Sequence, residues 1–370
     1  MKRLFSSKEN YLLHCAKSQS VNLSQEALLF KQRNYYHDKR QFFEWWYIDL
    51  TFKKGYQIVV IFHAPLYTFR FSKPYTTIEV YGQSGEKIAV SQCVETRRKS
   101  IKDDYGVAIG DNYFKGRYPL YELFWKNEDI ELNLVLKSQM KGWKLGTGLL
   151  FRDEKKERCF NWVVPVPRAT VSGSLKVKDR FFELDGIGYH DHNWGNFVLK
   201  DVFSWWYWGR IFADEYTVIY ADIKKKSGHL TPFMIARKGE TVFSTDRVEI
   251  LQDYWSRKNP GSLFSQQFTM KAANGEEQIE LTTKVNKIIE KYEYVFNPFQ
   301  SPFLRKVLND ILDGSHFLSH IPILAQTTKY CLGKSVYLRV LVAYDLRINS
   351  KERFTGNSIQ EIMLLRPASK

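Results

Sequence analysis

A hairpin of aromatic and β-branched residues occurs twice in the chain, and this repeat constrains the fold more than any other feature. Trp45-Trp46-Tyr47 returns 160 residues later as Trp205-Trp206-Tyr207. At the same offset, segment 55–62 lies against segment 215–222, and both are rich in residues that favour strands. Because tryptophan is rare, we interpret the match as an internal duplication rather than chance. The repeat predicts two related β domains.

The remainder of the chain also consists of short strand-like segments separated by turns. Lys53-Lys54-Gly55 separates two strand-like segments, and Gly82-Gln83-Ser84-Gly85 separates two more. A helical stripe of apolar residues occurs only late, at about 302–312, where core packing explains it. The sequence therefore predicts an all-β fold of antiparallel strands, in a barrel or a sandwich, with a few short helices.

The length of 370 residues exceeds what one ordinary core supports, so two domains are expected. Pro165 and Pro167 interrupt the series of strands, and proline suits a junction because it cannot donate to a strand ladder. We predict an N-terminal β domain at 1–167 and a C-terminal β domain at 168–370, which includes the helix near 302–312.

The net charge of +15 allows three explanations. Nucleic-acid binding would need a basic stripe or a known motif, and the basic residues form neither. A lysine-rich surface that keeps the protein soluble is favoured, and weak attraction to an anionic membrane surface is second. No apolar run reaches the length of a membrane-spanning helix. We expect a cytoplasmic protein, with membrane association at most peripheral.

The densest group of chemically capable side chains is Gly188-Tyr189-His190-Asp191-His192-Asn193-Trp194-Gly195. Its glycines allow backbone conformations that other residues resist, so the segment can turn and still present its side chains. We predict that this segment and the aromatic strand at 205–208 share one pocket.

The repeat also compares one copy of the hairpin with the other. Val60 and Phe62 of the first copy are replaced by Tyr220 and Asp222 in the second. Tyr220 and Asp222 share one strand face with Val218, and we predict that this face points inward. A buried carboxyl has a raised pKa, because its charged form loses water, and can act as a general acid.

Two residues of the motif complete the predicted catalytic set. His192 would take up the proton later or hold a water molecule, and Trp194 would lie beside it. Aromatic faces stabilise cationic centres, so neighbouring aromatic residues are expected to bind the substrate. These substrate-binding candidates are Tyr189, Trp205, Trp206 and Trp208. Each residue alone also has an ordinary structural explanation, as a satisfied aspartate, a loop histidine or a core aromatic, and only their combination predicts a site.

Competing chemistry has weaker support in the sequence. His190, Asp191 and His192 could ligate zinc or iron, but an isolated HxH pair is a weak signal, and we predict no metal site. The nucleophile motif GxSxG of serine hydrolases and a glycine-rich phosphate-binding loop are both absent.

Three of these segments resemble a known superfamily. They are the Glu-Trp-Trp-Tyr hairpin at 44–47, the motif at 188–195 and the Trp-Trp-Tyr strand at 205–207. Together they resemble the carotenoid 1,2-hydratase (hydroxyneurosporene synthase) superfamily, which includes attachment-protein-like proteins and lipocalin-like Diels-Alderases. The resemblance covers about residues 40 to 365. It is specific to the superfamily rather than to one reaction.

The resemblance implies two lipocalin-like β-barrel domains, a hydrophobic pocket and no cofactor. The hydratase residues correspond to His192, Trp194, Tyr220 and Asp222, with Asp222 as the proton donor. We therefore predict acid-initiated hydration or cyclisation of an apolar polyene or isoprenoid, in natural-product biosynthesis. The alternatives are a pericyclase that folds a polyene, and a lipid-binding protein that catalyses nothing.

Overall fold

The computed structural model describes residues 19–21, 43–53, 55–64, 74–82, 85–94, 98–100, 106–197, 199–225, 228–252, 264–294 and 335–365. In these ranges the chain forms two curled antiparallel sheets and one short helix, α3 (Leu199–Val202). The predicted all-β class with two barrel-like halves is confirmed. The predicted helix near 302–312 lies outside the described residues.

The first sheet holds the strands up to residue 195, and the second holds the later ones. The first comprises β1 (Gln19–Val21), β2 (Phe43–Phe52), β3 (Gln57–Ala64), β4 (Tyr75–Tyr81), β5 (Lys87–Val94), β6 (Arg98–Ser100), β7 (Gly106–Ile109), β8 (Asn112–Arg117), β9 (Leu120–Lys126), β10 (Ile130–Ser138), β11 (Gly142–Lys144), β12 (Leu149–Asp153), β13 (Arg158–Val177) and β14 (Arg180–Gly195). The second comprises β15 (Phe203–Ala213), β16 (Tyr216–Lys225), β17 (Gly228–Leu230), β18 (Phe233–Arg237), β19 (Glu240–Thr245), β20 (Glu249–Gln252), β21 (Gln267–Ala273), β22 (Gln278–Tyr294), β23 (Ser335–Ile348) and β24 (Glu352–Leu364).

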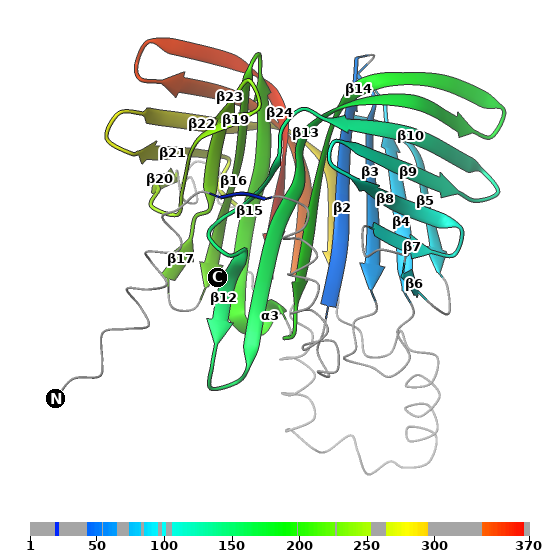
Figure 1. Ribbon diagram of the computed structural model, residues 1–370, viewed down its shortest axis with the longest axis horizontal. Coiled ribbons are helices and arrows are strands. Elements are labelled where there is room, and N and C mark those ends of the chain that lie inside the picture. Colours follow the sequence, from blue (N-terminus) through cyan, green and yellow to red (C-terminus); the bar gives the residue numbers. More distant parts are fainter. Residues whose placement is uncertain are drawn as a thin grey trace, which may run out of the picture.

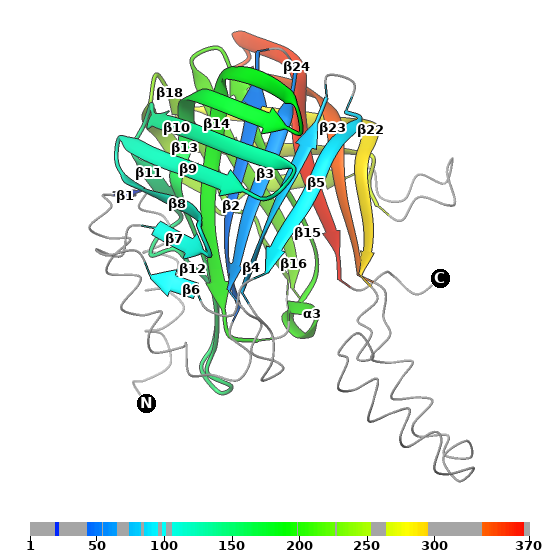
Figure 2. The same ribbon diagram turned by 90° about the vertical axis from the view of Figure 1, so that its right-hand side faces the viewer.

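Both sheets follow a nearly sequential meander. The first runs β5-β4-β3-β2-β14-β13-β10-β9-β8-β7-β6, and the second runs β19-β18-β16-β15-β24-β23-β22-β21-β20. Figure 1 shows the two curled sheets side by side, with β2, β14, β15 and β24 near the centre, and in Figure 2 the first sheet lies in front of the second. Strand β14 lies in the middle of the first sheet, where it pairs with β2 on one side and β13 on the other.

The chain changes from one sheet to the other after Gly195, whereas the predicted domain junction was at 167. That junction falls inside the long strand β13. Pro165 and Pro167 are accommodated by two shifts in the register between β13 and β14, on either side of Val166. The prolines interrupt the ladder locally without ending the strand, which is how sheets tolerate proline. The division into two domains stays a prediction.

Apolar side chains gather in three regions. One fills the curl of the first sheet, where Ile48, Val60 and Leu134 are fully buried. Another fills the curl of the second sheet. The third lies between the sheets and takes side chains from both; we call it the inter-sheet layer. It includes Phe43, Tyr47, Met140, Trp143, Phe160, Trp162, Tyr189, Trp208, Ile219 and Met234.

The two repeated hairpins differ by one residue in strand register. Trp46 pairs with Phe62 in the first hairpin, but Tyr207, and not Trp206, pairs with Asp222 in the second. The turn after β2 is longer than the two-residue turn between β15 and β16, so the first strand of each hairpin is displaced. A slip of one residue turns every side chain to the other face. The predicted alignment at a constant offset of 160 therefore holds for β3 and β16 but not for β2 and β15.

The predicted inward face of β16 is confirmed. Tyr216, Val218 and Tyr220 lie in the core of the second curl, and Asp222 is fully buried on the same face. Ile219, from the alternate set, lies in the inter-sheet layer. Strand β16 is therefore buried on both sides.

No helix in the described part of the chain has the length and apolar character that crossing a membrane requires. Attraction to a membrane surface stays a prediction.

A buried ion pair joins the two sheets. Arg210 on β15 donates from Nε to Oδ2 of Asp49 on β2 over 3.0 Å, and both side chains are nearly inaccessible. Its Nη2 donates to Thr51 Oγ1 over 3.0 Å, and its guanidinium lies 4.5 Å from the ring centre of Phe212. Removing one partner would leave the other charge buried and uncompensated.

We expect Asp49→Ala to lower the free energy of unfolding by about 3–5 kcal/mol, because Arg210 would lose its counter-charge. Lys53→Ala is the matched control, since it removes an ion pair with Asp185 whose side chains are 76% and 63% exposed. Urea unfolding would measure both variants. Equal midpoints for the two would contradict the role of the buried pair.

Candidate active site

The part of strand β14 from 188 to 195 is buried on both faces, and neighbouring residues of this motif point in opposite directions. His192 stacks on Trp46 inside the curl of the first sheet, with ring centroids 4.5 Å apart. Tyr189 lies on the face that meets the second sheet, where its ring centroid is 5.1 Å from that of Trp208. The motif therefore serves two separate places.

The carboxyl group of Asp191 lies in the inter-sheet layer and is almost fully buried. Its Oδ2 accepts hydrogen bonds from the Tyr189 hydroxyl over 2.9 Å and from Trp162 Nε1 over 3.0 Å. Its Oδ1 accepts a hydrogen bond from Asn193 Nδ2 over 2.7 Å. Three donors from two adjacent strands of the first sheet thus hold this carboxyl in one orientation.

Burial raises the pKa of Asp191 to about 7, because the charged form loses its water. The charge of Glu361 raises the pKa further, while the hydrogen bonds from Tyr189, Trp162 and Asn193 lower it. Near neutral pH the carboxyl therefore exists in both protonation states. This is the property that a general acid needs at that pH.

Aromatic rings surround the carboxyl. Tyr47 lies 5.3 Å from Trp208 and 6.5 Å from Tyr189, measured between ring centroids. Trp162 meets Trp143 edge to face at 5.4 Å. We call Tyr47, Trp162, Tyr189 and Trp208 the aromatic wall. Ring faces of this kind attract a cationic centre.

A second buried carboxyl lies on the other side of Tyr47. Glu361 Oε1 accepts hydrogen bonds from Tyr47 over 2.6 Å, from Tyr337 over 2.5 Å and from Arg339 Nη2 over 3.2 Å. Arg339 also pairs with Glu79 of the first sheet, so the network joins the two sheets. Burial raises the pKa of Glu361, although the charge of Arg339 opposes that shift.

The predicted acid and its tyrosine lie elsewhere, inside the curl of the second sheet. Tyr220 donates from its hydroxyl to Gln360 Oε1 over 3.2 Å. Asp222 Oδ1 lies 2.8 Å from Nδ1 of His229, whose ring is 5.4 Å from that of Trp205. Asp222 is therefore buried as predicted, but it is bound to an imidazole.

His192 and Trp194 lie together inside the curl of the first sheet, with ring centroids 4.7 Å apart. His192 Nε2 is 2.9 Å from Oε1 of Glu44, and both side chains are buried. The inter-sheet layer separates this pair from Asp222. The structure therefore places His192 and Trp194 apart from Asp222, because the faces of β14 and β16 that carry them point into different curls. The shared pocket of the motif and the aromatic strand stays a prediction.

The predicted substrate-binding residues are divided in the same manner. Tyr189 and Trp208 meet in the inter-sheet layer, and Trp206 packs against that layer while remaining partly exposed. Trp205 faces the curl of the second sheet instead.

Sequence analysis missed four polar side chains of these sites, namely Glu44, Asp191 as an acid, His229 and Glu361. Asp191 belongs to the motif. Because side chains alternate between the two faces of a strand, it could have been assigned to the opposite face from His190 and His192. Glu44 and Glu361 meet His192 and Tyr47 only through the long-range arrangement of the strands, for which the sequence carries no local signal. His229 follows Asp222 by seven residues in the hairpin of β16 and β17.

The metal-ligand alternative finds no support in the geometry of the motif. Asp191 faces the inter-sheet layer, while His190 packs against Phe114 in the first curl. Within the described ranges, no three histidine, cysteine or acidic side chains gather as a metal site would require.

Comparisons with known proteins confirm the resemblance. The model of the Diels-Alderase-like family matches residues 123–274. A Chlorobaculum tepidum protein named hydroxyneurosporene dehydrogenase is 38% identical over 65 residues, which are 16% of this chain and 17% of that protein. Diels-Alderase poxQ of Penicillium oxalicum is 31% identical over 98 residues, which are 25% of this chain and 22% of that protein. The matched segments thus span about a fifth of these curated relatives.

Similarity in fold to solved structures covers more of the chain than these sequence matches do. The crystal structure of kievitone hydratase from Nectria haematococca has a TM-score of 0.55, with 14% identity, over 88% of this chain and 90% of that one. At this identity the likeness shows a shared fold.

We expect the free energy of unfolding to depend on pH through the protonation of Asp191. Its pKa is about 7 in the folded protein against the usual 3.8, so the folded state binds the proton more tightly than the unfolded chain. The resulting stability is fully present below about pH 4 and is lost as the pH rises through about 7. In Asp191→Asn, the fall of the urea midpoint between these pH values should be smaller than in the wild type.

Asp185→Asn is the control, because Asp185 lies on the same strand but is exposed. It should keep the wild-type profile. A profile of Asp191→Asn that superimposes on the wild type would contradict the raised pKa of Asp191.

Proposed function

The chain resembles the Diels-Alderase-like family in sequence and fold, and from this premise we propose that it is a cofactor-independent enzyme. Its reaction would be the acid-initiated hydration or cyclisation of an apolar polyene or isoprenoid. The observation that carries the proposal is the carboxyl of Asp191, buried among the rings of the aromatic wall with a pKa of about 7.

The reaction needs a proton donor, a shield for the cation and a way to return the proton. Asp191 in its acid form would protonate one carbon of a double bond, leaving a carbocation on the other. The aromatic wall would stabilise that cation by cation–π attraction. Water, or a second double bond of the substrate, would then attack the cation. The proton lost at that step would return to the Asp191 carboxylate, so the cycle closes with no added cofactor.

Asn193 can support both protonation states of the acid. Its Nδ2 donates to Oδ1 of the carboxylate over 2.7 Å. When Oδ1 carries the proton, a rotation of the amide by half a turn presents the Asn193 oxygen as an acceptor. Tyr189 and Trp162 bind the other oxygen, Oδ2, in either state. The proton is thereby directed to one oxygen.

The residue set predicted from the sequence remains a second proposal for the acid. In that version Asp222 donates the proton and Tyr220 orients it, with His192 and Trp194 as partners. Burial of Asp222 supports it, and the contact with His229 offers a group that can exchange protons with Asp222. Its weakness is the separation of Asp222 from His192 by the inter-sheet layer.

A pericyclase is the alternative function, and the match to the Diels-Alderase-like family favours it. Such an enzyme would fold a polyene into a reactive conformer and needs shape rather than an acid. It would keep its activity without the Asp191 carboxyl and lose it when the aromatic wall is trimmed.

We expect Asp191→Asn to lower turnover by about 100-fold or more, the usual contribution of general acid catalysis. Mass spectrometry of apolar compounds that co-purify from the native host would identify the substrate and product. The wild type should yield a product with one added water or a cyclised isomer, and Asp191→Asn should yield the precursor.

Asp222→Asn is the matched variant, since both changes remove one buried carboxyl. Loss of product in Asp222→Asn alone would mean that Asp222, in the curl of the second sheet, is the acid. A rearranged product of unchanged mass in both variants would indicate the pericyclase. The same unreacted lipid in wild type and variants would overturn the catalytic proposal and leave a lipid-binding protein.

A further inference from the structure

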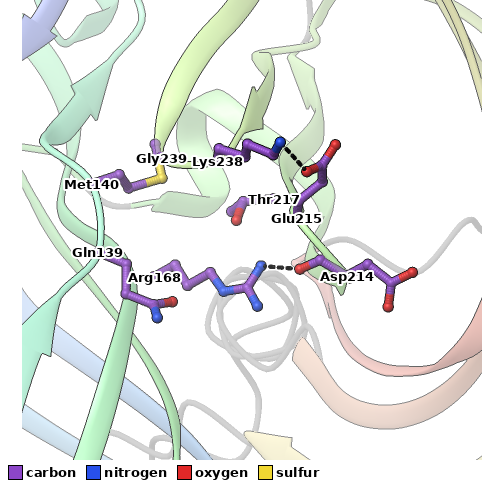
Figure 3. A pocket seen from close by; sticks show the side chains of 8 residues that line it. All are labelled: Gln139, Met140, Arg168, Asp214, Glu215, Thr217, Lys238 and Gly239. Carbon is purple, nitrogen blue, oxygen red and sulfur yellow. Dashed lines mark hydrogen bonds and ion pairs between the residues drawn. The ribbon is translucent and has the colours of Figure 1, made fainter.

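A polar cleft of about 330 Å³ opens where the two sheets meet. Figure 3 shows its lining, which comes from both halves of the chain. The first sheet and its turns contribute Gln139, Met140 and Arg168, and the second contributes Asp214, Glu215, Thr217, Lys238 and Gly239.

Arg168 reaches this cleft because of the two prolines in β13. The register between β13 and β14 shifts from Val166 to Ala169, so Arg168 lies in an irregular part of the ladder. Its carbonyl oxygen accepts a hydrogen bond from the backbone N–H of Gln139 over 2.8 Å. Irregularities of this kind re-aim a side chain, and here Arg168 is aimed across to the second sheet.

The Arg168 guanidinium is held by backbone carbonyl groups and makes no direct ion pair with a described carboxylate. Nη1 donates to the backbone carbonyls of Asp214 over 2.8 Å and Tyr216 over 3.3 Å, and the group lies 5.4 Å from the ring centre of Phe212. Its Nε–H is buried and meets no hydrogen-bond acceptor among the described residues. The same ranges contain no carboxylate in an ion pair with Arg168.

The charged side chains that line the cleft balance in number, because Arg168 and Lys238 stand beside Asp214 and Glu215. The Glu215 carboxylate is shared by Lys238, 3.2 Å away, and Arg237. In Figure 3 the Asp214 carboxylate points away from the guanidinium, and only its backbone oxygen faces Arg168. Burial lowers the pKa of Arg168, and the charge of Asp214 offsets part of that shift. A partly buried cation of this kind favours an anion as its ligand.

The cleft borders the inter-sheet layer at one residue. Met140 lines the cleft and belongs to the same apolar cluster as Trp162, Tyr189 and Trp208 of the aromatic wall. A ligand with a charged end at Arg168 would therefore have the apolar side chain of Met140 beside it.

We propose that this cleft binds the carboxylate end of an amphiphilic polyene, with the guanidinium of Arg168 as its principal partner. The inference rests on the proposed function for the apolar nature of the ligand. It adds that the substrate is an acid rather than a neutral hydrocarbon, and that its charged end fixes which double bond reaches Asp191.

The probe for this site is trans-parinaric acid, a conjugated polyene acid whose fluorescence rises in apolar surroundings, beside its uncharged methyl ester. The wild type should bind the acid about tenfold more tightly than the ester, as expected for a hydrogen-bonded charge pair. Arg168→Gln should weaken binding of the acid to the level of the ester and leave the ester unchanged. Arg152→Gln is the control, because it removes the same charge from an exposed position.

Equal affinity of the wild type for acid and ester would overturn the proposal. Equal weakening of both ligands by Arg168→Gln would do so too, because it would mean that Arg168 only holds the sheets together. Displacement of the acid, but not of the ester, by inorganic phosphate at equal concentration would show a site for any small anion, and the head-group assignment would fall. Asp191→Asn should bind both probes normally, so a failure of the acid mechanism is distinguishable from a failure of this site.

Discussion

The alternation of side chains along β14 is the constraint on which the arrangement of this protein depends. Because both faces of the strand are buried along the motif at 188–195, each residue of the motif must satisfy its polar atoms on one side or the other. His192 does so with Glu44 in the first curl, and Asp191 does so with Tyr189, Trp162 and Asn193 between the sheets. One strand thereby divides its chemistry between two compartments.

Polar groups between the sheets hold the two halves in one relative position. The Asp49–Arg210 pair and the Arg339 network with Glu79 and Glu361 each connect side chains from both sheets. Burying a charged group raises the free energy of the folded state unless the group is paired. If one sheet slid over the other, these pairs would separate and their charges would be left buried without partners. The same low-polarity surroundings raise the pKa of Asp191. The exclusion of water from the inter-sheet layer thus has two effects. It makes the buried charge pairs hold the sheets in place, and it raises the pKa of Asp191.

The fold class could be predicted from the sequence because the features that indicate it are local in the chain. Turn residues and alternating strand segments mark hairpins, and the inward face of β16 with Tyr220 and Asp222 followed from period two. The site was harder to predict, because a difference of one residue in strand register between the two hairpins places Trp205 and Trp45 on opposite faces. Glu44 meets His192 across 148 residues of sequence, and Glu361 meets Tyr47 of the other sheet across 314 residues. Such distances depend on the register of whole sheets, which no short motif specifies.

The central claim is that Asp191 carries a proton near neutral pH within the inter-sheet layer. Infrared difference spectra between the wild type and Asp191→Asn, recorded across a pH titration, test it directly through the carbonyl stretch of a protonated carboxyl. The account predicts a band that belongs to Asp191 and disappears with a midpoint of about 7. Disappearance of that band near the ordinary value of 3.8 would contradict it.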